Sequence, residues 1–91
     1  MPDEPTSMQA QSNLGEAQDS VHKARRAVHQ ALSNTTETAL FEAGNALVKA
    51  QNAVAALTDS PMQPAVNQIR GELASVEDQF NQAKSQQPTD R

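Results

Sequence analysis

The sequence of 91 residues contains no cysteine, no tryptophan and no tyrosine, and phenylalanine occurs twice. The absence of cysteine excludes disulfides and thiolate metal sites. No uninterrupted apolar run approaches the ~18 residues that a membrane-spanning helix needs. Fifteen of the apolar residues are Ala, which bury little surface. Any core is therefore thin, and either marginal stability or self-association is expected.

Positive charge is also scarce. Seven Lys and Arg stand against eleven Asp and Glu, giving a formal net charge of −4 and a pI of about 4.9. This balance argues against nucleic acid as a partner, because neutralising phosphates requires a basic surface. The first five residues are acidic and carry no apolar leader. We therefore expect a cytoplasmic protein, unless processing has removed a leader.

The clearest pattern present is an apolar seam that recurs three times in alternating steps of three and four residues. A mean step of 3.5 residues keeps one face of a helix directed at a neighbouring helix, as in coiled-coil-like bundles. The eighteen seam positions are Leu14, Ala17, Val21, Ala24, Val28, Ala31, Leu40, Ala43, Leu47, Ala50, Val54, Leu57, Val66, Ile69, Leu73, Val76, Phe80 and Ala83.

The seam is interrupted where capping and turn residues occur. Asn13 is the preferred cap of the first helix, and Asn34, followed three positions later by Glu37, is the expected cap of the second. Ser60 and Pro61 suit the cap and first position of the third helix, since proline needs no donor there. These signals predict helices at about 14–32, 36–57 and 62–84.

The short connections between these helices require consecutive helices to lie antiparallel. The sequence therefore predicts an all-α protein, an antiparallel up-down-up three-helix bundle over residues 13–84. Residues 1–12 are expected to form a flexible N-terminal arm and residues 85–91 a flexible C-terminal tail. The alternative is a long hairpin that completes its core with a second copy of the chain.

The sizes of the seam residues predict how the helices pair. In the first two helices large residues alternate with Ala, and small seam residues let helix backbones approach closely. The third helix carries bulkier residues. We expect the first two helices to form a close pair that the third helix covers.

A basic cluster lies on the first helix: His22, Lys23, Arg25, Arg26 and His29. The spacing places His22, Arg25, Arg26 and His29 on one side. This side could bind an anion or acidic partner, more strongly as the histidines protonate. The alternative is a solvated face that complements the helix dipole. A metal site at His22 and His29 is not expected, because they lie seven residues apart with no chelating carboxylate between them.

The second helix has an apolar surplus beside its seam. Phe41, Val48 and Ala55 recur every seven residues, one position beyond the seam. They widen the apolar face beyond what a simple helix pair needs, and such a stripe suits a partner helix or a second copy. The alternative is that these residues help to cover another helix of the same chain.

No Gly-rich phosphate loop, Ser/His/Asp set, paired carboxylates or ligand quartet is present, so we expect no enzyme, cofactor, metal or small-molecule substrate. The general pattern resembles small helical proteins of Gram-positive bacteria, without a motif that assigns a family. The expected function is a protein–protein interaction module that binds either a second copy of itself, as a homodimer, or another helical protein. The alternatives are anion or nucleic-acid binding through the basic cluster, and peripheral attachment to a membrane or other surface.

Overall fold

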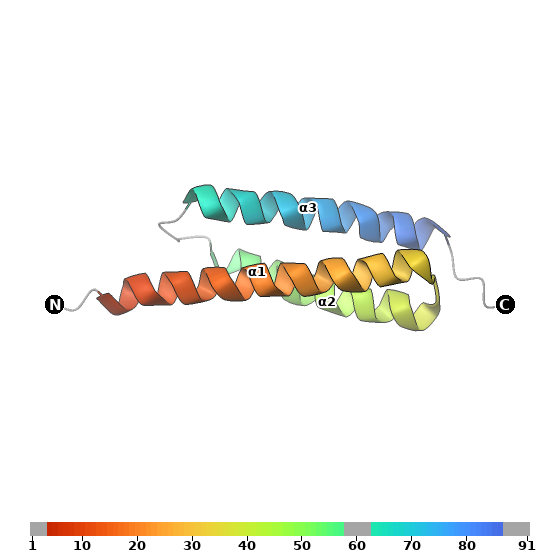
Figure 1. Ribbon diagram of the computed structural model, residues 1–91, viewed down its shortest axis with the longest axis horizontal. Coiled ribbons are helices and arrows are strands. Elements are labelled where there is room, and N and C mark those ends of the chain that lie inside the picture. The colour runs from red at the N-terminus through yellow and green to blue at the C-terminus, as the bar shows by residue number, and fades with distance from the viewer. Residues whose placement is uncertain (1–3, 58–62, 87–91) are drawn as a thin grey trace.

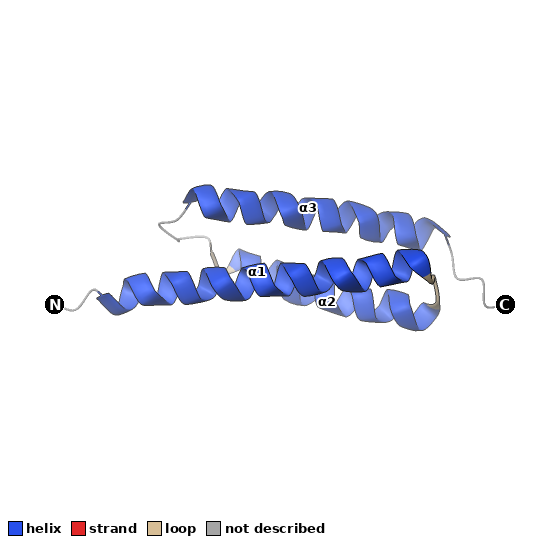
Figure 2. Cartoon of the chain, viewed as in Figure 1, coloured by secondary structure: helices blue, strands red, loops and turns tan. Residues whose placement is uncertain are grey.

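The computed structural model describes residues 4–57 and 63–86, and the side chains of residues 12–57 and 63–86. This part of the chain folds into three helices: α1 (Glu4–Ser33), α2 (Glu37–Ala55) and α3 (Gln63–Gln86). Each helix runs antiparallel to the one before it, and all three pairs are in contact (Figure 1). Helices account for the secondary structure of these residues (Figure 2). The predicted all-α, up-down-up three-helix bundle is confirmed.

The start of α1 differs from the prediction. The helix begins at Glu4 and continues through Asn13, so the cap at Asn13 is wrong, and residues 4–12 are helical where a flexible arm was expected. Pro5 stands in the first turn, where its missing N–H is not needed. No proline follows within α1, and Gly15 costs only about 1 kcal/mol in a helix. Nothing in this segment therefore forces a break.

Residues 34–36 connect α1 to α2, as the turn chemistry predicted, but the cap is Thr36 and not Asn34. The Thr36 backbone is extended (φ −118°, ψ 163°), and its hydroxyl accepts a hydrogen bond from the Ala39 amide at 3.0 Å. Asn34 instead continues the end of α1, donating its backbone N–H to the Gln30 carbonyl oxygen at 2.9 Å. A cap must precede the first free amides of its helix, and here Thr36 holds that position.

The second connection lies partly outside the described residues, and so do the predicted cap at Ser60 and Pro61 and the last part of the predicted tail, residues 87–91. Helix α2 ends at Ala55, two residues before the predicted end, and Ala56 and Leu57 form a turn. Helix α3 starts at Gln63 and extends to Gln86, so residues 85 and 86 are helical where a tail was expected. The cause is the absence of a helix breaker before Pro88.

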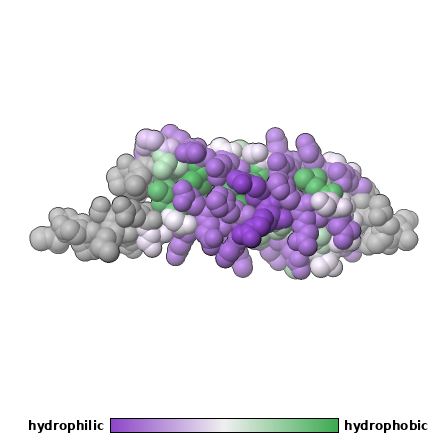
Figure 3. Space-filling model, in the orientation of Figure 1, coloured by the Kyte–Doolittle hydropathy of each residue, from purple (hydrophilic) through white to green (hydrophobic). Residues whose placement is uncertain are grey.

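The core consists of the predicted seam. Every buried apolar residue of the described part occupies a seam position. The other three seam residues, Leu14, Leu40 and Phe80, are partly buried and pack against this core. Among these residues no polar side chain is buried. The face turned to the viewer in Figure 3 is accordingly hydrophilic over most of its area, with small hydrophobic patches along the line where α1 and α3 meet.

The three helix pairs are not equivalent. Helix α1 makes its most extensive contact with α2, whereas α2 and α3 have the least contact. The small seam residues of α1 and α2 are completely buried, as the predicted close pair requires: Ala17, Ala24, Ala31, Ala43 and Ala50. The sparse contact between α2 and α3 leaves room for a groove.

Candidate protein interaction surface

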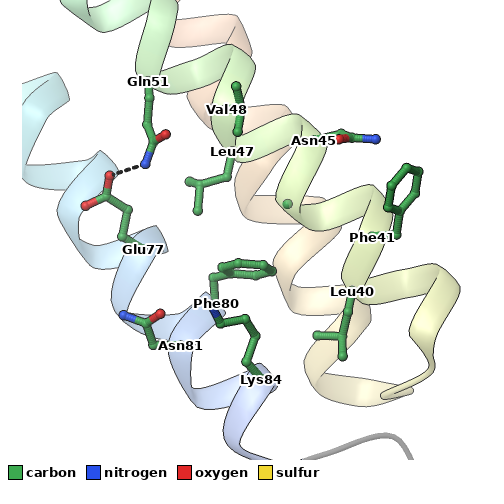
Figure 4. A pocket seen from close by; sticks show the side chains of 11 residues that line it. Leu40, Phe41, Asn45, Leu47, Val48, Gln51, Glu77, Phe80, Asn81 and Lys84 are labelled. Carbon is green, nitrogen blue, oxygen red and sulfur yellow. Dashed lines mark hydrogen bonds between the residues drawn. The ribbon is translucent and has the colours of Figure 1, made fainter.

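A groove of about 600 Å³ runs between α2 and α3. Leu47 points from α2 toward α3, and Phe80 points back from α3 toward α2 (Figure 4). Phe41 and Asn45 lie on the side of α2 away from α3. The lining is mixed apolar and polar, with a single carboxylate and a single ammonium group: Leu40, Phe41, Gly44, Asn45, Leu47, Val48, Gln51, Glu77, Phe80, Asn81 and Lys84.

A glycine and an aromatic ring determine the shape of this groove. A Cβ atom at Gly44 would lie 3.4 Å from Cζ of Phe80, so the ring packs against the bare α2 backbone at this point. The ammonium group of Lys84 lies 5.1 Å from the centre of the same ring, within the range of a cation–π interaction. These contacts hold the Phe80 ring in place as one wall of the groove.

A hydrogen bond crosses the groove at its other end. Gln51 Nε2 donates to Glu77 Oε2 at 2.8 Å, joining α2 to α3 (Figure 4). Both side chains are at the surface, so the bond is open to water. An exposed bond of this kind contributes little net stability, because water replaces it at low cost.

The apolar stripe predicted on α2 lies at the surface. Phe41 is 69% exposed and Val48 is 52% exposed, and they are the two large apolar side chains left exposed among the residues whose burial is described. Ala55 is also exposed but does not line the groove. The alternative that the stripe covers another helix of the same chain is therefore wrong for Phe41 and Val48.

We call the solvent-facing side of α2 its outer face: the residues within about 60° of Val48 on a helix that turns 100° per residue. This outer face contains no charged residue beyond the first turn of the helix, where Glu37 lies in line with it. The other charged residues of α2, Glu42 and Lys49, line a separate depression of about 310 Å³ with Lys23 of α1. Beyond the first turn, the members of the outer face are Phe41, Gly44, Asn45, Val48, Gln51, Asn52 and Ala55.

The side chains of the basic cluster of α1 contact different helices. His29 Nε2 lies 3.1 Å from Gln79 Oε1, and an Arg25 guanidinium nitrogen lies 3.7 Å from Glu72 Oε1, so both side chains extend toward α3. Lys23 Nζ lies 3.3 Å from Asp19 Oδ2 on its own helix. Carboxylates thus already partner two of the cationic groups, an arrangement typical of a solvated surface.

His22 and Arg26 complete the predicted cluster, and both are exposed. No hydrogen bond or ion pair joins either side chain to another residue in the described ranges. The anion-binding role of these five residues stays a prediction.

The described residues contain no group of three or more metal-ligating side chains close enough to hold an ion. Within these same residues, none of the helices combines the length and apolar character needed to cross a bilayer. Chemically, the site consists of exposed apolar side chains with amides around them.

The architecture defines the class of this protein, a small antiparallel three-helix bundle with a groove of mixed apolar and polar lining between α2 and α3. No protein-family model, curated protein or solved structure matches the chain.

Sequence reasoning found one side of this surface and missed the other. The seven-residue spacing indicates Phe41 and Val48, whereas the seam pattern predicts Phe80 as a core residue and gives no signal for Lys84. The signal that could have identified the second wall is Gly44, which stands one turn from both Phe41 and Val48 and leaves space beside the stripe.

Proposed function

We propose that this protein is a non-enzymatic protein–protein interaction module that binds a helical partner through the outer face of α2 and the adjoining groove. The observation that carries the proposal is the exposure of Phe41 and Val48 on one helix face that has no charged residue from Phe41 to Ala55. The chain has few large apolar residues, and two of them are exposed to water. This exposure is unfavourable in free energy, and a bound partner that covers both side chains would remove it. Burial of each side chain would contribute roughly 1.5 to 3 kcal/mol.

The form of the surface supports a helix as the partner. A groove between two helices accepts an amphipathic helix, whose apolar residues recur at the same three- and four-residue steps. Phe80 and Leu47 supply the apolar wall and floor, and the surrounding amides can pair with polar groups at the edge of a bound helix. The cytoplasmic location expected from the sequence stays a prediction.

Photo-cross-linking in the cells that produce the protein tests this proposal. A photoreactive amino acid replaces Asn52 on the outer face, and the matched control carries it at Gln82, an exposed position of α3. We expect protein adducts at position 52 that are absent at position 82. Adducts at position 52 should be lost in the double variant Phe41→Ser/Val48→Ser, because its apolar contacts are removed while its core is unchanged.

Mass spectrometry of the adducts identifies the bound chain, including a second copy of this one. Circular dichroism of the double variant must show unchanged helicity, since both substituted side chains lie outside the core. Equal labelling at positions 52 and 82, or adducts that survive the double substitution, would overturn the proposal.

A further inference from the structure

The partner that best complements the outer face of α2 is the same face of a second copy, and this inference rests on the proposed function. The first argument is charge. The protein carries a net charge of −4, so two copies repel each other at most surfaces. The outer face has no charged side chain from Phe41 to Ala55, and two such faces can meet without burying or opposing like charges.

The second argument is the order of residue sizes along the face. If two α2 helices cross antiparallel with Val48 at the two-fold axis, Phe41 of each copy lies opposite Ala55 of the other. The large ring thus faces the smallest side chain of the stripe at both ends, and Val48 faces Val48 in the centre. A parallel pairing would place Phe41 against Phe41 at one end and Ala55 against Ala55 at the other. The two helix axes would then have to be farther apart at the Phe41 end than at the Ala55 end.

The polar members of the face follow the same arrangement. In the antiparallel pairing each edge of the face meets the same edge of the second copy, so Asn45 lies beside Asn52 of that copy, and two amides can exchange hydrogen bonds without a charge. Two Glu37 residues are held at opposite ends, whereas a parallel pairing would bring these carboxylates together. Antiparallel helix dipoles also attract.

We propose that this protein forms a homodimer in which the outer faces of two α2 helices pack antiparallel about a two-fold axis at Val48. An interface of this kind is isologous and closes on itself, so it stops at two copies. Helix α2 has 19 residues and is about 28 Å long. A single helix face of this length buries less than the ~1,200 Å² of standard interfaces, so the dimer is weak and exchanges rapidly.

Disulfide trapping tests the pairing and its direction, because the chain has no cysteine of its own. Facing residues of packed helices have Cα atoms within the ~7 Å that a disulfide tolerates. We expect Val48→Cys to form a covalent dimer under mild oxidation, at several times the yield of the exposed control Gln82→Cys. Ala55→Cys alone should stay at the control level, since in the dimer its two copies are about 21 Å apart along the helices.

In an equimolar mixture of Phe41→Cys and Ala55→Cys, the disulfide dimer that joins one chain of each variant should form in higher yield than the dimer of either variant with itself. Ala55→Cys retains both Phe41 and Val48, so its failure to pair with itself cannot come from a damaged surface. Self-pairing of Ala55→Cys above the control would overturn the antiparallel arrangement. A Val48→Cys yield no higher than that of Gln82→Cys would overturn the homodimer, while adducts of other proteins at position 52 would leave the proposed function standing.

Discussion

Replacing Leu57 by Ala is expected to lower the melting temperature of the protein by roughly 10 to 30 °C. Leu57 is 1% exposed and is among the largest fully buried side chains of the described residues. It follows the end of α2, where its backbone N–H donates to the Val54 carbonyl oxygen at 3.0 Å, and its side chain joins the same core cluster as Val66 of α3. Truncation of a buried Leu to Ala costs about 2 to 5 kcal/mol.

This loss is large for a core of this size. A domain of this length has a total stability of roughly 5 to 15 kcal/mol, and an Ala-rich core places it at the low end. One kcal/mol changes the melting temperature of a small domain by about 4 to 8 °C. Thermal denaturation followed by circular dichroism measures the shift.

Leu40→Ala is the matched control for Leu57→Ala, because it removes the same atoms from a residue that is only partly buried. Its melting temperature should fall clearly less. An equal fall in melting temperature for the two variants would show that Leu57 contributes no more to the core than the partly buried Leu40.

Enlarging Ala24 to Leu is expected to destabilise the bundle by about 1 to 3 kcal/mol, although a larger apolar side chain is introduced. Ala24 is 0% exposed, and so is Ala50 of α2. These small residues allow the backbones of α1 and α2 to approach closely, so three additional carbon atoms must separate the helices or adopt strained rotamers. Ala50→Leu should have the same effect from the other helix.

The control is Ala74→Leu on the exposed side of α3, where the same atoms enter solvent. Leu and Ala have similar helix propensities, so this melting temperature should change little. Chemical or thermal denaturation of the three variants measures the differences. A higher melting temperature for Ala24→Leu or Ala50→Leu would show that α1 and α2 are not a close pair.

The core was predictable because burial follows the 3.5-residue period directly. Val21, Val66 and Val76 occupy seam positions. A seam position faces the neighbouring helices, so these apolar side chains are buried. Helix ends were less predictable. Asn34 and Thr36 are both good caps, and only the extended backbone at Thr36 selects between them.

The candidate surface was half predictable for a related reason. Spacing alone placed Phe41 and Val48 beyond the seam. Phe80 lies on the seam of α3, and its position as a groove wall depends on how far α3 is displaced from α2, which no local pattern specifies. The contact with Gly44 is likewise a property of two helices and not of either sequence segment.

Sedimentation equilibrium over a wide concentration range tests most directly that two copies of the chain pack together through the outer face of α2. The account predicts that the apparent mass rises from the 9.8 kDa of one chain toward twice that value as concentration increases. The double variant Phe41→Ser/Val48→Ser should remain at the mass of one chain with the same helicity. A wild-type chain that stays monomeric at every concentration, or a double variant that dimerises equally well, would contradict it.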